Sequence, residues 1–205
     1  MHKFYVGRLK DGQISPELAS RMFRMRHRIF RERLGWDVCS VAGLERDEFD
    51  DATTVYVIAK NLNSGEVDAS WRLRPTTERY MLRDTFPQLL YRKDAPADEK
   101  IWEVSRFAVS TMCKDDRSYG FTELTQDLVA RTVEFGLTKE IRSFVWVCSA
   151  GVERLALRLG YRPRRFGPPL HIGSVLSVAA ELPIDALTCE IALRRLNEQP
   201  LQVAA

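Results

Sequence analysis

The hydrophobic residues near the start of the chain recur at the spacing of a buried helix face. Four of them fall at i, i+4, i+7 and i+11: Leu18, Met22, Met25 and Ile29. Ser15 and Pro16 mark the start, because serine is a good N-cap and proline is tolerated in the first turn. Gly35 follows as a residue that commonly ends a helix. The pattern therefore predicts a helix between Ser15 and Gly35 with one face in the core.

The rest of the chain alternates between strand-like and helix-like patterns. We expect strands at 2–8, 54–59, 66–74, 101–109, 143–148, 161–166 and 173–180, and helices at about 121–138, 151–159 and 184–196. The turn residues Asn63, Ser64 and Gly65 join the second and third strands into a hairpin. Residues 36–52 are too acidic and irregular to predict a regular element.

The order of these elements predicts the architecture. No repeat, linker or shift in composition divides the chain, so residues 1–205 are expected to form a single domain. The order favours an α/β fold, a three-layer α-β-α sandwich with a mixed central sheet. It resembles the N-acetyltransferase (GNAT-like) fold. That resemblance implies that two central strands splay apart and admit the arm of a thioester.

Composition narrows the class of protein. The chain has globular proportions, with 45% hydrophobic and 29% charged residues. No stretch reaches the ~18 apolar residues of a membrane-spanning helix, and the first residues lack the apolar core of a signal peptide. The four cysteines form no Cys-x-x-Cys pair and the three histidines are scattered. We therefore expect a cytoplasmic protein with reduced thiols, no metal and no membrane contact.

Charge is nearly balanced overall but unevenly distributed. The 31 basic and 28 acidic residues give a net charge of +3. Residues 45–51, the acidic loop, hold five acids and one base, whereas residues 151–170 hold five arginines and one acid. One segment could bind a cation and the other an anion. A solvated surface is the alternative for both.

The acidic loop is a candidate binding site for a cation. Asp47 and Asp50 can converge on one point in a loop, and Trp36 precedes them as an aromatic partner for a positive charge. A sulfonium ion would suit such a site. A calcium loop is the competing interpretation, but the spacing, central glycine and final glutamate of an EF-hand are missing.

A second candidate is the Glu103-Val-Ser105-Arg106-Phe107 segment of a predicted strand. Alternation places Glu103 and Arg106 on opposite faces of the sheet, so a shared site requires a β-bulge between them. A buried, purely structural ion pair is the alternative. A third candidate is the segment 117–122, whose glycine at the start of a helix resembles a degenerate phosphate loop.

Taken together, these segments resemble the acyl-homoserine-lactone synthases, the LuxI-type autoinducer synthases. The matching motifs occur in the family's order within about residues 1–110: Arg26-x-x-x-Phe30, Leu34-Gly35-Trp36, Glu45-x-Asp47-x-Phe49-Asp50, Arg72-Leu73-x-Pro75-Thr76-Thr77 and Trp102-Glu103-x-Ser105-Arg106-Phe107. The resemblance implies acylation of the α-amine of S-adenosylmethionine (SAM) by a thioester of acyl carrier protein or coenzyme A. Lactone closure then releases methylthioadenosine, with no cofactor and no metal.

The resemblance also assigns roles to residues. It implies Glu103, Asp47 and Arg106 as catalytic residues, with Glu103 the first candidate for the base, through a water molecule, and Asp47 its rival. Arg26 and Arg72 hold the methionine carboxylate or tie the acidic loop to the sheet. The residues implied for SAM binding are Arg26, Phe30, Trp36, Asp47, Asp50, Arg72, Ser105 and Phe107.

The later half of the chain is expected to serve the acyl donor. By resemblance, the acyl chain passes the strand that holds Trp146 and Ser149. Because some relatives have a small hydroxyl residue where Trp146 aligns, a short or medium unsubstituted chain is expected, although Trp146 packing in the core is the alternative. The expected docking surface for an acidic carrier consists of five arginines: Arg154, Arg158, Arg162, Arg164 and Arg165.

Two other functions explain part of the sequence. An N-acetyltransferase that uses acetyl-CoA accounts for the fold and the 117–122 segment, but not for the acidic loop near Trp36. A nucleic-acid-binding module accounts for the arginines between 154 and 165, but the net charge of +3 and the acidic loop disfavour it.

Overall fold

A computed structural model describes residues 1–110 and 123–198. The elements follow the chain in this order: β1 (His2–Gly7), α1 (Pro16–His27), the π-helix η1 (Arg28–Arg33), β2 (Ser40–Val41), β3 (Leu44–Glu45), β4 (Val55–Asn61), β5 (Val67–Pro75), α2 (Met81–Asp84), the 3₁₀-helix η2 (Pro87–Leu90), β6 (Ile101–Val109), α3 (Glu123–Thr138), β7 (Ser143–Ser149), α4 (Ala150–Arg158), β8 (Arg164–Arg165), β9 (Leu170–Ile172), β10 (Val175–Pro183) and α5 (Ala186–Glu198).

A mixed sheet forms the centre of the molecule. Its strands lie in the order β1-β4-β5-β6-β7-β10-β8, and β9 also pairs with β10. Neighbours are antiparallel except β6 and β7, which are parallel. The parallel pairing stops at Glu103 and Val145, although both strands continue beyond it. The predicted splay of two central strands is therefore confirmed.

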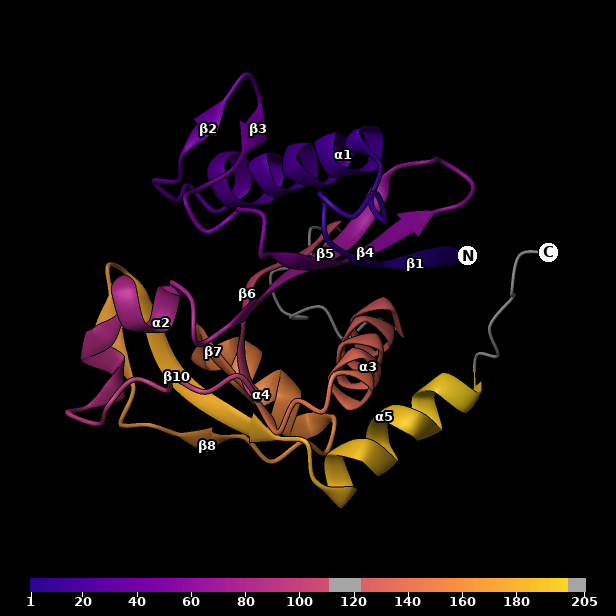
Figure 1. Cartoon of the computed structure of the whole chain (residues 1–205). Helices are drawn as coiled ribbons and strands as arrows, with labels where there is room; N and C mark the ends of the chain where they lie inside the picture. Colours follow the sequence, from indigo (N-terminus) through magenta and orange to yellow (C-terminus); the bar gives the residue numbers. More distant parts are fainter. Residues whose placement is uncertain (111–122, 199–205) are drawn as a thin grey trace.

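Helices cover both faces of this sheet (Figure 1). Helix α1 lies on one face, and α2 and η2 cover the same face further along, over β6, β7 and β10. Helices α3 and α4 lie on the opposite face, and α5 packs outside α3. The predicted three-layer α-β-α sandwich is confirmed.

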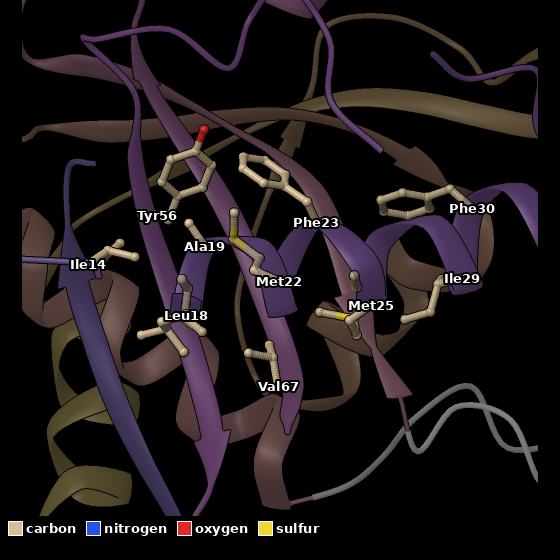
Figure 2. Close-up of a cluster of buried hydrophobic side chains, with 12 residues drawn as sticks. Ile14, Leu18, Ala19, Met22, Phe23, Met25, Ile29, Phe30, Tyr56 and Val67 are labelled. Atoms are coloured by element: carbon tan, nitrogen blue, oxygen red, sulfur yellow. The ribbon is translucent and has the colours of Figure 1, made fainter. Parts of the chain in front are cut away.

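Helix α1 forms as its sequence predicts. The hydroxyl of Ser15 accepts a hydrogen bond from the backbone N–H of Leu18 at 3.2 Å, and Pro16 occupies the first turn. The four residues of the predicted apolar stripe are buried and pack with Tyr56 and Ile58 of β4 (Figure 2). The helix continues as the π-helix η1, after which Gly35 takes a φ of +64° that suits glycine.

The sequence patterns missed several short elements. The segment 36–52 contains the β2–β3 hairpin, and α2, η2 and β9 were not predicted. The strand expected at 161–166 is limited to the two residues of β8. Each is too short to show a period, so tertiary contacts determine it.

No helix within residues 1–110 and 123–198 is long and apolar enough to cross a bilayer. The three cysteines in these two ranges, Cys39, Cys148 and Cys189, are not bridged.

Candidate active site

A cluster of ionised side chains is buried between α1, the acidic loop and the sheet. We call it the charge cluster, and its side chains are at most 10% exposed: Arg26, Glu45, Asp47, Asp50, Arg72 and Arg106. Its three arginines balance its three carboxylates. Because its members come from α1, the acidic loop, β5 and β6, the cluster joins four parts of the chain that are distant in sequence.

Arg26 connects the helix to both ends of the acidic loop. Its two terminal nitrogens donate to the two oxygens of Asp50, each at 2.9 Å, and its Nε donates to Glu45 at 2.5 Å. The hydroxyl of Tyr56 donates to Asp50 at 3.0 Å. Burial by itself would raise the pKa of Asp50, but Arg26 and Arg72 outweigh it and hold that pKa well below its usual value.

Asp47 is shared by two arginines from the sheet. Its carboxylate accepts a hydrogen bond from Arg72, and its other oxygen accepts from Nη2 of Arg106 at 2.5 Å. Arg106 also donates from Nε to Glu45 at 3.0 Å, which closes the network. Asp47 and Asp50 therefore converge as the sequence predicts, but arginines already compensate their charges. Arg72 thus ties the acidic loop to the sheet, and Arg26 ties it to α1.

A β-bulge in β6 positions Arg106. Arg72 pairs with Ser105 and Ser70 pairs with Ala108, so two residues of β6 lie opposite Trp71 of β5. Arg106 has a φ of +55°, a strained value for a residue with a side chain. The bulge that was inferred from the spacing of Glu103 and Arg106 is confirmed. It turns the Arg106 side chain toward the same face as Glu103.

Glu103 and Arg106 nevertheless do not form an ion pair. The two oxygens of Glu103 accept hydrogen bonds from the backbone N–H groups of Met81 at 3.0 Å and Leu82 at 2.7 Å. The carboxylate therefore caps the start of α2, whose backbone donors have no partner within the helix. Burial raises the pKa of Glu103, and these hydrogen bonds offset part of the effect. Met81 links the two residues, because its sulfur contacts Nη1 of Arg106 at 3.3 Å.

Aromatic rings lie beside the charge cluster. Phe30 and Trp36 stack with centroids 5.2 Å apart and planes 3° apart. Phe30 is buried, whereas Trp36 is 41% exposed. The guanidinium of Arg106 lies 5.7 Å from the centre of the Phe30 ring. The site thus presents one accessible aromatic face next to buried ion pairs.

An apolar cavity lies between the splayed strands on the α3–α4 side of the sheet. It encloses about 100 Å³, several times the space that one water molecule needs. Its walls include Ser105, Arg106 and Phe107 of β6, as well as Phe144, Trp146 and Cys148 of β7. Trp146 therefore faces the cavity as the acyl-chain hypothesis requires. Arg106 contributes both to this cavity and to the charge cluster.

Ser149 is a correction to the expected acyl pocket. It does not line the cavity. Its side chain instead accepts a hydrogen bond from the backbone N–H of Val152 at 3.3 Å and caps helix α4. An N-terminal serine is a common helix cap, so its position directly before a predicted helix was the signal for this role.

The five arginines of the expected docking surface have different surroundings. Arg165 donates from Nε and Nη2 to the buried carboxylate of Glu153, each at 2.5 Å. This pair fixes the Arg165 side chain against α4. Arg162 donates to the carbonyl oxygens of Gly160 and Tyr161. All five arginines are nevertheless exposed, and Arg154 and Arg158 lie on α4. The docking surface stays a prediction.

Sequence reasoning overlooked three residues of the site. Glu45 joins Arg26 to Arg106, Tyr56 donates to Asp50, and Met81 connects Glu103 with Arg106. Only Glu45 carried a signal, as part of the acidic loop. In the described part of the chain, no group of three or more histidine, cysteine or acidic side chains is arranged to hold a metal ion. The phosphate-loop candidate at 117–122 lies outside the described residues.

Known proteins resemble this chain over nearly its whole length. A family model described as autoinducer synthase matches residues 13–191. The acyl-homoserine-lactone synthase of Pseudomonas aeruginosa is 36% identical over 202 residues, which cover 97% of this chain and 98% of the relative. The crystal structure of the AHL synthase LasI matches with a TM-score of 0.83 at 35% identity, and the alignment covers 94% of each chain.

Two further structures bear on the ligands and the fold. BjaI, a CoA-dependent acyl-homoserine lactone synthase solved with SAM and isopentyl-CoA, matches with a TM-score of 0.83 at 26% identity, covering 96% of this chain and 90% of its own. A Lactobacillus plantarum protein assigned as an N-acetyltransferase has a TM-score of 0.58 at 14% identity, covering 90% and 99%. The second likeness shows the fold alone, and it confirms the expected GNAT-like architecture.

Asp50→Asn should destabilise the protein strongly. The change leaves Arg26 and Arg72 buried without a full counter-charge, a defect that typically costs about 3–5 kcal/mol. Glu48→Gln, in the same loop but exposed, is the matched control and should leave stability unchanged within about 0.5 kcal/mol. Urea unfolding at neutral pH measures both.

The same pair of variants tests the pKa of Asp50. Its folded-state pKa lies below the unfolded value of about 4, so the carboxylate stabilises the fold above that pH. The difference between wild type and Asp50→Asn should therefore shrink as the pH falls below about 4. A difference that is small at neutral pH, or that grows on acidification, contradicts the assigned ion pairs.

Proposed function

The chain belongs to the autoinducer synthase family and is an acyltransferase, and we propose that it makes an acyl-homoserine lactone from SAM and an acyl thioester. The observation that carries the proposal is the position of Arg106. This residue binds the carboxylates of the charge cluster and also lines the apolar cavity. A polar substrate beside the cluster and an acyl chain in the cavity would meet at the bulge of β6.

SAM would bind on the α1 side of the sheet. The exposed face of Trp36 suits its sulfonium or adenine group, because an aromatic face attracts a cation and stacks on a base. Nη2 of Arg72 is buried and has no hydrogen-bond partner in the part of the chain that the structure describes. We assign this nitrogen to the methionine carboxylate, since a buried charged donor without an acceptor is costly. Asp47 and Asp50 then act mainly by holding the arginines in place.

Glu103 is the proposed base for the amine of SAM. A free α-amine has a pKa of about 7.7–8, so moderate basicity is sufficient. Both oxygens of Asp47 are bound by arginines, which hold its charge in place. Glu103 is held by backbone N–H groups and not by arginines, and its raised pKa suits a proton acceptor that acts through water.

The neutral amine would attack the thioester carbon directly. The carbon–sulfur bond of the thioester then breaks, and the carrier leaves as a thiolate that takes up a proton released by the amine. The bulge residues Arg106 and Phe107 lie opposite a single residue of β5, and β7 has already diverged at this level. We assign the oxyanion to a backbone N–H of this pair. Cys148 lines the cavity, but burial raises the pKa of its thiol to about 12. The thiol therefore stays protonated, which disfavours an acyl-enzyme intermediate.

Lactone closure would follow within the acylated product. The methionine carboxylate attacks its own γ-carbon, the carbon–sulfur bond breaks, and the electron pair leaves on the sulfur of methylthioadenosine. An acetyltransferase reaction would stop before this step. We propose acyl carrier protein or coenzyme A as the acyl carrier and the cytoplasm as the location, where reduced thiols such as Cys39, Cys148 and Cys189 persist.

Purified protein should convert SAM and an octanoyl thioester into octanoyl-homoserine lactone and methylthioadenosine in equal amounts. Glu103→Gln should lower the rate by about 10²–10⁴-fold and remain folded, because it removes the base while keeping the shape. Glu99→Gln, an exposed neighbour, is the control. Mass spectrometry measures both products. Acylated amine without methylthioadenosine contradicts lactone synthesis. A wild-type rate in Glu103→Gln contradicts the role of Glu103 as the base.

Reversing the charge of Arg154 and Arg158 should weaken use of an acidic acyl carrier. The double change to glutamate is expected to raise KM for octanoyl-acyl carrier protein about tenfold, with little change in KM for SAM, and added salt should mimic it. Arg24→Glu, exposed on the opposite face, is the control. Equal increases for octanoyl-CoA would instead assign these arginines to the phosphopantetheine phosphate, and no increase contradicts docking here.

Trp146→Ala should shift the preference toward longer acyl chains. The change removes a large ring from the cavity wall, and one methylene in an apolar pocket is worth about 10–200-fold in selectivity. Steady-state kinetics with hexanoyl to dodecanoyl thioesters gives the profile. Trp102→Ala, in the same apolar core but not on the cavity wall, should lower stability without moving the preference. Identical chain-length profiles for the two variants would mean that Trp146 only packs in the core and does not select the acyl chain.

A further inference from the structure

Trp71 holds a buried hydrogen-bond donor that the protein leaves unused. Its indole Nε1 is inaccessible to solvent and has no hydrogen-bond partner within residues 1–110 and 123–198. The residue lies on β5, lines the cavity and packs against Phe107, with ring centroids 5.1 Å apart and planes tilted by 59°. A buried N–H without an acceptor has lost its hydrogen bonds to water and gained none in return, so such groups are rare. Their presence calls for a specific explanation.

A second tryptophan in the same apolar core does have a hydrogen bond for its indole N–H. Nε1 of Trp102 donates to the carbonyl oxygen of Glu99 at 3.0 Å. Two of the cavity hydroxyls are engaged elsewhere. Ser105 accepts from Arg72 at 3.0 Å, and Thr132 donates to the carbonyl of Leu128 at 2.9 Å. An acyl oxygen in the cavity would supply the acceptor that the described residues do not give Trp71.

The position of Trp71 indicates which part of the ligand this is. In the register of β5 and β6, it is the residue opposite the two bulge residues Arg106 and Phe107. Its neighbour Arg72 points to the other face and carries the second unpartnered nitrogen of this strand segment. The two donors thus flank the place where the amine and the acyl group would meet. The reactive end of the acyl group would lie at this point, and an oxygen there is carried by its first or its third carbon.

We propose that the indole N–H of Trp71 donates a hydrogen bond to an oxygen of the acyl group and so positions the thioester for attack. The proposal rests on the proposed function for the identity of the ligand. A C1 oxygen is common to all acyl thioesters, whereas a C3 oxygen occurs only in substituted chains. Comparing the two kinds of chain therefore identifies the acceptor.

Kinetics of variants that remove only the donor tests the role. Trp71→Phe, and 3-benzothienyl-alanine at position 71, keep an aromatic ring but lack the N–H. Both should lower kcat/KM by about tenfold or more, while the midpoint of urea unfolding stays the same or rises because an unsatisfied donor is gone. Equal losses with octanoyl and 3-oxo-octanoyl thioesters identify the C1 oxygen, and a loss confined to the 3-oxo substrate identifies C3.

Trp102→Phe is the matched control, because it removes an indole whose hydrogen bond is satisfied. It should lower the unfolding midpoint and leave kcat/KM for each of the two thioesters unchanged. If Trp71→Phe behaves like Trp102→Phe, with lost stability and unchanged kcat/KM, Trp71 only packs and the proposal is overturned.

A measurement without turnover separates this proposal from the proposed function. The ¹H–¹⁵N indole resonance of Trp71 can be assigned by its loss in Trp71→Phe. Octanoyl-CoA added without SAM should move that resonance downfield, whereas S-octyl-CoA, which lacks the carbonyl, should not. A downfield shift in a protein that forms no lactone supports the hydrogen bond and rejects the function. Lactone formation with an unmoved resonance and a wild-type rate in Trp71→Phe rejects the hydrogen bond.

Discussion

A guanidinium or carboxylate that moves from water into a protein interior loses several kcal/mol of hydration. Six such groups are buried together between α1, the acidic loop and the sheet, and they recover much of that loss by pairing with one another. Arg26 binds Asp50 with two parallel hydrogen bonds, the strongest geometry for this pair. The helix, the loop and strands β5 and β6 are therefore held in one arrangement.

The bulge of β6 depends on this network and connects it to the cavity. Arg106 adopts a backbone conformation that costs about 1–3 kcal/mol, and its bonds to Glu45 and Asp47 offset that strain. The bulge lies just beyond the point where β6 and β7 stop pairing. The charge cluster therefore lies on one face of the sheet and the apolar cavity on the other, and Arg106 belongs to both. This is the arrangement that joining a zwitterion to an acyl chain requires.

Periodicity predicted the elements that bury a continuous face. The stripe of α1 and the full length of β6 follow from it, whereas the spacing of Glu103 and Arg106 required a bulge only if the two residues share a site. Elements of a few residues have no measurable period. Helix α2 exists because Glu103, 22 and 21 residues away, binds its first N–H groups. Composition likewise showed the charges of the acidic loop. It did not show the arginines that bind them, because these arginines lie on α1, β5 and β6.

The balance of the charge cluster has a consequence for the proposed chemistry. Unpaired carboxylates beside the amine of SAM would stabilise its ammonium form and raise its pKa, which opposes nucleophilic attack. Pairing Asp47 and Asp50 with arginines removes that penalty. Loss of the ammonium proton takes SAM from a net charge of +1 to zero, and lactone closure then consumes its carboxylate and sulfonium charges together. Both changes reduce charge, so a site that is neutral, desolvated and lined on one side by apolar residues favours them.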